Sequence, residues 1–382
     1  MNTQLSQDEK VLLELIQAGL WQRTPEIPEG FRGWSRVFSM AKKQSVFGVV
    51  SKTILACPKI LNTLPNEVRL KLKSFMVSNV LLSNQIDAEL VALATAFREN
   101  GIRAVLLKGR GLAQYYPYPE LRQCGDIDLY IAPEDALKAY DVLKAKASRI
   151  DDPLYVHCGK HYTAKVNEVE VEIHRHINTH AFRRYRRSFE QFSSKGLNED
   201  LQVLRLDGAQ ICTPETTFNA YYIFDHLFEH FLVSGVGFRQ LCDWMLFLHC
   251  NRDGIDRERL RQMLTELNML RPWQVFGSVL VEHFGMPAGE FPMYDPQARQ
   301  DKVMAHILEE GNFGKETQYY KSTSRSFLMK KLKSFWWHIR RGTEMVFIFP
   351  QQEVRHMVFL ISNALQYIRT HYTIKKSQKN GR

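Results

Sequence analysis

Two aspartates alternate with aliphatic residues in the segment from Asp126 to Leu129. On a β-strand, Asp126 and Asp128 project from the same face about 7 Å apart, because side chains alternate and the rise is about 3.3 Å per residue. Two ionised carboxylates this close repel each other and are costly to bury. A divalent cation removes the conflict, since Mg²⁺ is held by one or two carboxylates together with substrate phosphates. The pattern indicates a metal site, the alternative being the solvated face of an edge strand.

A basic turn with two glycines precedes the aspartates. Gly109 and Gly111 allow the backbone to approach a ligand closely, and Lys108 and Arg110 supply positive charge beside it. Gly109 and Asp126 flank a short predicted helix, so two adjacent strands would bring the turn and the carboxylates together. We therefore expect the turn to face the same ligand as the two aspartates.

A third acidic residue follows in the segment of residues 169–176, which reads VEVEIHRH. Glutamates and histidines share one parity of this predicted strand, and aliphatic residues share the other. A carboxylate from a neighbouring strand would complete the metal site and orient an attacking hydroxyl. Glu170 and Glu172 face the same way, so their spacing leaves the choice between them open.

The hydrophobic periodicity predicts the elements that position these residues. From Ser6 to about Asn100 the apolar residues recur at helical spacing, and Gly101 ends the last helix. From Ile102 the period becomes that of strands, and Asn167-Glu168 resembles a two-residue hairpin turn. The helical period returns at Thr213-Pro214-Glu215, with the proline at the first helical position. We expect an α+β protein with an N-terminal helical region (1–100), an α+β core (101–207), a C-terminal helical domain (208–370) and a basic, disordered tail (371–382).

The segment Lys108–Ile131 combines Lys-Gly, Tyr-Tyr-Pro-x-Pro-x-Leu-Arg and Asp-Ile-Asp-Leu. In this combination it resembles the uncharacterised nucleotidyltransferase-like family of bacterial genomes, within the DNA polymerase β-like nucleotidyltransferase superfamily. Weaker similarity lies in Glu172-Ile173-His174 and in the segment Gly237–Asp243. The resemblance extends over most of the chain, to about Phe349. It implies a nucleotidyltransferase-type mixed β-sheet core between the two helical regions.

The resemblance also implies roles for individual residues. Asp126 and Asp128 would bind two Mg²⁺ ions, or Mn²⁺ in their place. Glu172, two residues before His174 as in the family, would be the third catalytic acid and metal ligand. A nucleotide would be bound by the turn and by the cations that neutralise its triphosphate, namely Lys108, Gly109, Arg110, Gly111 and Arg122.

The activity implied by the resemblance is transfer of a nucleoside monophosphate from an NTP to a hydroxyl acceptor, with release of pyrophosphate. The acceptor would be an RNA, a protein side chain or a small molecule. The wider superfamily has Gly-Ser or Gly-Gly in the turn, whereas this chain has Gly109-Arg110. This departure keeps open an alternative, a catalytically inactive protein on the same fold that senses nucleotide or binds a partner.

The composition describes a soluble globular protein of 382 residues, with 45% hydrophobic and 24% charged residues. Its net charge of +10 favours an anionic partner such as a nucleotide, a nucleic acid or an acidic surface. Two basic patches are candidates for binding an anionic partner: residues 183–187 for RNA or a phosphorylated acceptor, and residues 330–341 for a nucleic acid or a membrane surface. The alternative is a solvated helix face for the first patch and a packed core for the tryptophans of the second.

Other sequence features bear on the cellular location of the protein and on two alternative functions, a zinc site and a metalloprotease. The six cysteines include no C-x-x-C pair, which favours reduced thiols and a cytoplasmic protein. The first apolar run follows acidic residues and lacks a basic region before it, and no apolar stretch reaches the roughly 18–20 residues that cross a bilayer, so we expect neither a secretory signal nor a membrane span. The irregular spacing of Cys158 and the nearby histidines argues against zinc. His226 and His230 lack the H-E-x-x-H order of a metalloprotease, which leaves packing or contact with the nucleotide.

Overall fold

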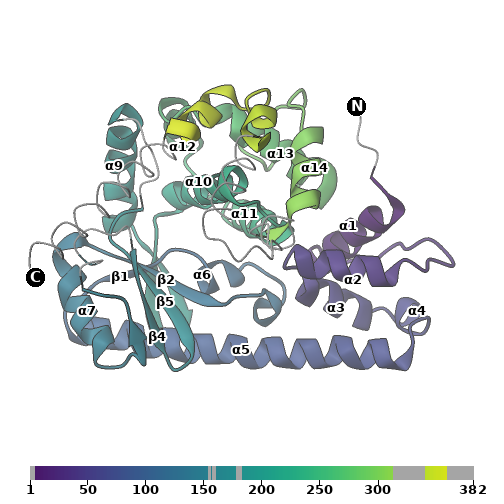
Figure 1. Cartoon of the computed structure of the whole chain (residues 1–382), viewed down its shortest axis with the longest axis horizontal. Helices are drawn as coiled ribbons and strands as arrows, with labels where there is room; N and C mark the ends of the chain where they lie inside the picture. The colour runs from purple at the N-terminus through teal and green to yellow at the C-terminus, as the bar shows by residue number, and fades with distance from the viewer. Residues whose placement is uncertain (1–4, 154–155, 157–160, 178–182, 313–339, 359–382) are drawn as a thin grey trace, which may run out of the picture.

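The computed structural model describes residues 5–153, 156, 161–177, 183–312 and 340–358. Its centre is a seven-stranded mixed sheet with the strand order β3-β4-β5-β2-β1-β7-β6 (Figure 1). β2 runs parallel to β5, and β1 runs parallel to β7, whereas the other neighbouring strands are antiparallel. The strands are β1 (Ala104–Leu106), β2 (Asp126–Ile131), β3 (Arg149–Ile150), β4 (His161–Val166), β5 (Val169–His174), β6 (Gln202–Leu206) and β7 (Ala209–Thr213).

The central pair of strands aligns the acidic residues. β2 and β5 pair in parallel, with Asp126 opposite Glu170 and Asp128 opposite Glu172. β4 and β5 form the hairpin predicted from the sequence, and both turn residues have a positive φ (47° at Asn167 and 66° at Glu168). Because residues of one parity share a face, the register places all four carboxylates on the same side of the sheet.

The opposite face of the sheet is apolar and packs against helices. Aliphatic residues of β2 and β5 form one core with the C-terminal half of α5 (Asn66–Glu99) and with α7 (Ala136–Lys144). Figure 1 shows α5 running beneath both the sheet and the N-terminal helices. Those helices are α1 (Gln7–Leu20), α2 (Trp34–Lys43), α3 (Phe47–Leu55) and α4 (Pro58–Leu61). Ser6 caps α1 in a capping box with Glu9.

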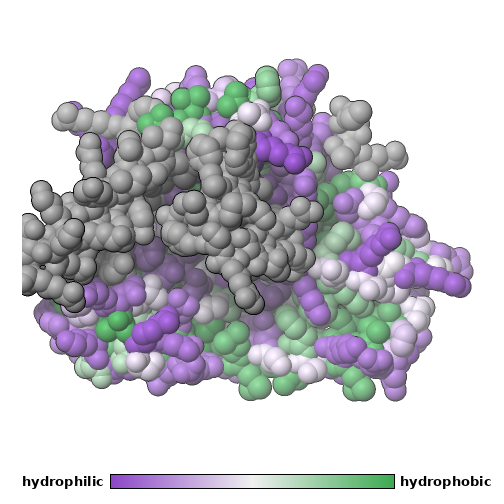
Figure 2. All heavy atoms as spheres, viewed as in Figure 1, coloured by the Kyte–Doolittle hydropathy of each residue, from purple (hydrophilic) through white to green (hydrophobic). Residues whose placement is uncertain are grey.

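Of the described helices, α5 is long and apolar enough to cross a membrane by length and composition. The sequence reading did not anticipate this, because polar residues interrupt the apolar ones. In its most apolar window, 44% is buried in the protein, and core helices of soluble proteins meet the same criteria, so the evidence for a span is weak. Figure 2 shows apolar side chains along the lower edge, where α5 lies. Its exposed apolar residues are Leu70, Val77, Leu81 and Leu82.

A helical layer covers the acidic face of the sheet. Its core is aromatic, with Phe224, Trp244 and Trp273 in mutual ring contact. Two further helical stretches span residues 340–345 and 350–358. The labelled helices of this layer are α9 (Arg183–Asn198), α10 (Thr216–Val233), α11 (Phe238–Cys250), α12 (Arg257–Glu266), α13 (Leu270–Phe284) and α14 (Asp301–Glu310). The α+β class and the mixed sheet between helical regions are confirmed.

Two details differ from the sequence prediction. The sheet continues past residue 207, because Asp207 and Gly208 form the turn between β6 and β7, and β7 pairs with β1. The helix expected to begin at Thr213-Pro214 begins instead at Thr216. Its cap is the Glu215 carboxylate, which accepts hydrogen bonds from the backbone N–H groups of residues 217 and 218. Pro214, which has no backbone N–H, was expected at the first helical position. Instead, the Glu215 carboxylate accepts hydrogen bonds from the first backbone N–H groups of the helix.

Candidate active site

A pocket of about 310 Å³ lies between the acidic face of the sheet and helices α10 and α11. The sheet side contributes the basic turn, Asp126 and Asp128. The helical side contributes Tyr222, His226 and Arg239. The lining includes Lys108, Gly109, Arg122, Asp126, Asp128, Glu170, Tyr222, His226, Arg239, Asp243 and Asn312. The pocket therefore joins carboxylates to a ring of cationic and neutral hydrogen-bonding groups.

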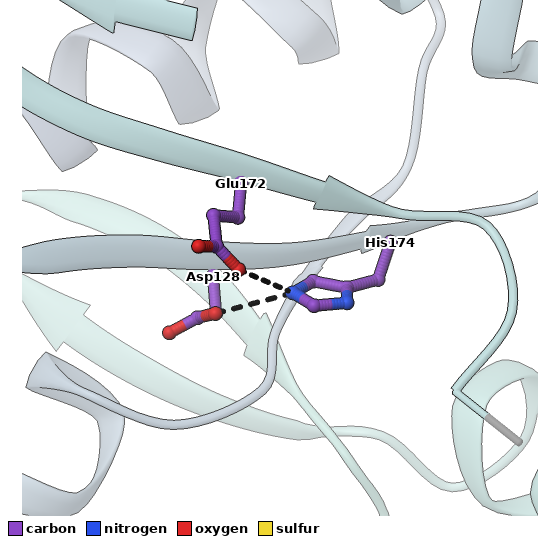
Figure 3. Close-up of side chains that lie close together, drawn as sticks. All are labelled: Asp128, Glu172 and His174. Atoms are coloured by element: carbon purple, nitrogen blue, oxygen red, sulfur yellow. Dashed lines mark hydrogen bonds and ion pairs between the residues drawn. The ribbon is translucent and has the colours of Figure 1, made fainter. Parts of the chain in front are cut away.

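Three side chains converge beside this pocket from β2 and β5 (Figure 3). One ligand atom each from Asp128, Glu172 and His174 lies within 4.8 Å of the others. The Nε2 atom of His174 is 3.1 Å from Oδ1 of Asp128 and 3.4 Å from Oε2 of Glu172. The convergence follows from the register, because Glu172 lies opposite Asp128 and His174 is two residues further along the same face.

Asp128 is the centre of this arrangement and has no exposed surface. Its Oδ1 atom is also 3.0 Å from the Nζ atom of Lys108. Burial by itself would raise the pKa of Asp128, but Lys108 and His174 lower it below the usual range, so the carboxylate is ionised. Its Oδ2 atom is buried and has no hydrogen-bond partner in the described part of the chain. A buried ionised oxygen without a partner, beside Glu172, fits a cation.

The titration of the neighbouring groups follows from the same charges. Burial and then the charge of Asp128 raise the pKa of Asp126. The hydrogen bond from His174 lowers the pKa of Glu172. Burial lowers the pKa of Lys108, but Asp128 and Asp126 outweigh it and raise that pKa. His174 behaves similarly, since burial lowers its pKa and the hydrogen bonds to Asp128 and Glu172 raise it.

The two candidates for the third acid occupy different positions. Glu172 is half-buried and belongs to the cluster with Asp128. Glu170 is exposed, lines the pocket and lies opposite Asp126 in the register. Asp126 lines the pocket but is not in the cluster of three. The geometry therefore favours Glu172 as the partner of Asp128 without bringing all three predicted acids to one point.

The turn after β1 contains one glycine that its backbone requires. Gly109 has a φ of 64° and caps the short helix α6 (Arg110–Ala113). A Cβ atom there would lie 3.3 Å from the Sγ atom of Cys124 and 3.4 Å from the carbonyl oxygen of Asp126. Gly111 instead packs against Leu106, and it does not line the pocket. Only the first glycine thus gives the backbone a close approach to a pocket ligand.

Arg110 points away from the pocket, toward α5. Its guanidinium donates to both carboxylate oxygens of Asp87, at 2.5 and 2.7 Å, and to the carbonyl oxygen of Pro119 at 2.8 Å. The residue is buried and does not line the pocket. The expected contact between Arg110 and a triphosphate has no support from this position, since an α5 carboxylate already engages the guanidinium.

Arg122 lines the pocket but is held by a carboxylate from α11. Its Nε and Nη2 atoms donate to Asp243 at 3.0 and 2.6 Å, and the hydroxyl of Tyr116 donates to the same carboxylate at 2.8 Å. Burial opposes the charged form, but Asp243 raises the pKa of Arg122. The pair joins the segment before β2 to the helical layer, so Arg122 builds the pocket wall with its charge largely balanced.

The sequence analysis did not single out Arg239, whereas it named His226 as a residue for packing or contact with the nucleotide. Arg239 lines the pocket at the start of α11, and its Nε atom is buried without a hydrogen-bond partner in the described residues. Burial, and then Lys108, lower the pKa of His226 well below its usual range, so this imidazole is neutral. Arg239 falls in the Gly237–Asp243 segment that carried weak family similarity, and this was the available signal for it. For His174 the signal was its parity with Glu172.

The two basic patches differ in the exposure of their arginines. In α9, Arg184, Arg186 and Arg187 are exposed, as a solvated face or a nucleic-acid contact requires. Arg341 of the second patch is buried, and its Nη1 atom is 2.8 Å from Oε2 of Glu310. The tryptophans and lysines at 330–337 lie outside the described residues, as do Cys158, His180 and the predicted tail at 371–382.

A model of the uncharacterised nucleotidyltransferase family matches residues 32–285, which is more than half of the chain. The chain belongs to this family. The match includes β1 to β7, α10 and α11, and so it covers every lining residue named above except Asn312. Membership in the family expected from Lys108–Ile131 is confirmed.

Among solved structures, this nucleotidyltransferase family member is similar to an antigenic nucleotidyltransferase-like protein from Paracoccidioides brasiliensis. The sequence identity is 13% and the TM-score is 0.33, over 53% of this chain and 93% of that chain. None of the curated proteins compared with the chain matches it.

Proposed function

We propose that this protein is a metal-dependent nucleotidyltransferase that transfers a nucleoside monophosphate from an NTP to a hydroxyl acceptor. The observation that supports the proposal most directly is the buried, ionised Asp128 with an unpartnered Oδ2 atom, facing Glu172 beside a pocket lined with cations. In the described residues, Lys108 and His174 contact Asp128 through Oδ1, so Oδ2 is available to a further partner such as a cation. The proposed acceptor is a hydroxyl group of an RNA, a protein side chain or a small molecule, and the proposed location is the cytoplasm.

Some residues at the pocket would bind the metal, and others would bind the nucleotide. Asp126, Asp128 and Glu172 would hold divalent cations, Mg²⁺ or Mn²⁺. Bound cations stabilise negative charge on the entering and leaving oxygens of an in-line displacement. Lys108 and Arg239 face the space where a triphosphate would lie, together with the backbone at Gly109. Arg239 would make the phosphate contact predicted for Arg110, because its Nε donor has no hydrogen-bond partner in the described residues.

The reaction then balances as a substitution at phosphorus. The acceptor oxygen forms a bond to the α-phosphorus, and the bond from that phosphorus to the bridging oxygen breaks. Pyrophosphate leaves with the electron pair, and the acceptor proton passes to Glu172, whose pKa is kept low enough for it to be a free carboxylate before attack. Helices α10 and α11 line the pocket on the side opposite the sheet.

Label transfer tests the proposal. Purified protein is incubated with each α-labelled NTP, with Mg²⁺ or Mn²⁺, and with cell extract as the source of acceptor. We expect labelled product and pyrophosphate, and a loss of about 10²-fold or more in Asp126→Asn, Asp128→Asn and Glu172→Gln. Glu168→Gln is the matched control, because Glu168 lies in the same hairpin, exposed and paired with Lys165. A loss in Glu170→Gln with normal Glu172→Gln would make Glu170 the third acid.

The second candidate is a nucleotide sensor that does not catalyse transfer. It is favoured by the contacts of Asp128, whose Oδ1 atom already has two partners, Lys108 and His174. An NTP that binds without transfer of label, under either metal and with every extract fraction, would select this function. Absence of both NTP binding and metal binding would exclude the two candidates together.

A further inference from the structure

We propose that His174 is a metal ligand, and that it gives this site a preference for a first-row transition metal, Mn²⁺, over Mg²⁺. The inference rests on the proposed function, since it concerns the same cation site. It adds a nitrogen ligand to a set that the family resemblance describes with carboxylates alone. The imidazole would coordinate through Nε2, the atom that already faces Asp128 and Glu172.

The spacing of the three ligand atoms supports coordination. Ligands that are about 2.0–2.2 Å from one ion, at right angles or slightly more, are roughly 3 Å from each other. The Nε2 atom of His174 is 3.1 Å from Asp128 and 3.4 Å from Glu172, in agreement with adjacent positions around an ion. The unpartnered Oδ2 atom of Asp128 supplies a further oxygen beside the same group.

The position of His174 is built by the sheet. It is the last residue of β5 and lies opposite Tyr130 of β2, two residues beyond Glu172 on the same face. On the β4 side, the ring of His161 is 5.3 Å from the ring of His174, centroid to centroid. The side chain of His174 is 15% exposed, and Figure 3 shows it turned toward the two carboxylates. A ring confined in this way presents Nε2 at little entropic cost.

The identity of the ion follows from ligand preference. Mg²⁺ selects oxygen ligands and gives up its water reluctantly. Imidazole nitrogen binds first-row transition metals well, and Mn²⁺ also suits carboxylate oxygens. Two carboxylates and one imidazole therefore match Mn²⁺ better than Mg²⁺. Coordination through Nε2 needs the neutral ring with its proton on Nδ1.

Electron paramagnetic resonance of the full chain tests the inference with Mn²⁺ and Mg²⁺ as the probes. We expect the wild-type protein to bind Mn²⁺ about 10-fold or more tighter than Mg²⁺, with an imidazole ¹⁴N coupling in the spin-echo spectrum. His174→Ala should lose that coupling and about 10-fold or more of its Mn²⁺ affinity, while its Mg²⁺ affinity changes less. His174→Gln, which keeps a polar side chain, guards against misfolding of the alanine variant.

The controls separate this inference from the proposed function. His161→Ala removes the neighbouring ring, which is outside the cluster of ligand atoms, and it should retain the ¹⁴N coupling. Bound Mn²⁺ without ¹⁴N coupling, or equal affinities for the two metals in both wild type and His174→Ala, would overturn the role of His174 and leave Mg²⁺-dependent transfer intact. Metal binding that is unchanged in Asp128→Asn would instead remove the site on which the proposed function depends.

Discussion

Charge balance around Asp128 explains how this buried carboxylate is tolerated without a metal. Lys108 and His174 both contact its Oδ1 atom, and they are the groups that lower its pKa against the effect of burial. Any cation that binds must share Asp128 with them or displace them. A triphosphate in the pocket would attract the Lys108 ammonium, so nucleotide and metal are expected to bind cooperatively.

Lys108→Met tests this competition. Without nucleotide, the variant should bind Mn²⁺ several-fold tighter than the wild type, because the competing ammonium is gone. Its NTP affinity should fall by about 10-fold, the effect of one charge-assisted contact. Isothermal titration with and without a non-hydrolysable NTP measures both. Lys165→Met, which removes an ammonium paired with Glu168 at the hairpin, is the control. Weaker metal binding in Lys108→Met would contradict the competition.

Gly109→Ala tests the backbone of the turn. The new side chain would have to adopt a φ of 64° and meet Cys124 and Asp126, so we expect a loss of about 1–3 kcal/mol of stability. Urea unfolding measures it. Gly289→Ala serves as the control, since a Cβ atom at Gly289 meets no other atom within 4 Å. An unchanged midpoint in Gly109→Ala would mean that the turn relaxes at no cost.

At this scale, the sequence predicted the residues whose pattern is local. Asp126 and Asp128 were predicted from the alternation of acidic and aliphatic residues, which is visible within one short strand. The partners of Arg110 and Arg122 were not found, because they lie 23 and 121 residues away. A basic residue beside a predicted phosphate turn looks the same in a sequence whether it faces the ligand or a distant carboxylate. His174 lies in a segment of weak family similarity, but its contact with Asp128 depends on the parallel pairing of β2 and β5.

Among the elements, the short helix α6 is fixed to α5 by the Arg110–Asp87 pair. Both side chains are largely buried, at 7% and 12% exposure. Removing one partner of such a pair leaves an uncompensated charge, whereas replacing both with apolar residues can be nearly neutral. This contrast separates a structural role of Arg110 from the phosphate contact that the sequence predicted.

We expect Arg110→Met to lose about 3–5 kcal/mol of stability and the double variant Arg110→Met/Asp87→Leu to recover most of it. Urea unfolding measures both. The double variant should bind NTP with nearly wild-type affinity, because Arg110 does not line the pocket. A stable double variant with greatly weakened NTP binding would restore the sequence-based role of Arg110.

Prediction of elements succeeded where the signal was short-range. The hairpin turn at Asn167-Glu168 is as expected. β6 and β7 were not identified as strands, because three of the five residues of β6 are exposed and little alternation remains. The position of β7 is decided by its pairing with β1, which is about a hundred residues earlier in the chain.

In the molecule as a whole, the C-terminal helices contain a second buried charge cluster. Arg341 lies between Glu310 of α14 and Glu353 of the stretch 350–358, and both carboxylates are buried. Burial is the main effect that raises the pKa of each to about 7, although Arg341 opposes it. One guanidinium cannot balance two buried carboxylates, so one of them retains its proton near neutral pH.

These pKa values predict the sign of a pH effect on stability. Between pH 4.5 and about 7 the folded protein holds protons that the unfolded chain has released, so this cluster contributes less stability as the pH rises. Glu353→Gln should therefore be more stable than the wild type at pH 8, by about 1–3 kcal/mol, and the difference should shrink toward pH 5. Thermal unfolding across this range measures it. A Glu353→Gln variant that is less stable at pH 8 would show that Arg341 needs both charges.

The large-scale organisation was predicted in outline, since the family, the α+β class and the helical regions on both sides follow from motifs and periodicity. The division at residue 100 did not anticipate that α5 packs on the sheet. The apolar stripe of a helix indicates that something covers it, but the sequence does not say what. Ile86, Leu90 and Phe97 pack in the same core as the strands, and Leu72 packs with the N-terminal helices.

The length of α5 determines which truncations of the chain leave a folded protein. At 34 residues it is about 50 Å long, and it belongs to two hydrophobic cores at once. A shortened gene that starts at residue 101 would leave the underside of the sheet without its cover, and its product should be insoluble. A shortened gene that ends at residue 100 would expose the half of α5 that the sheet normally covers. A minimal active fragment must therefore keep α5 whole.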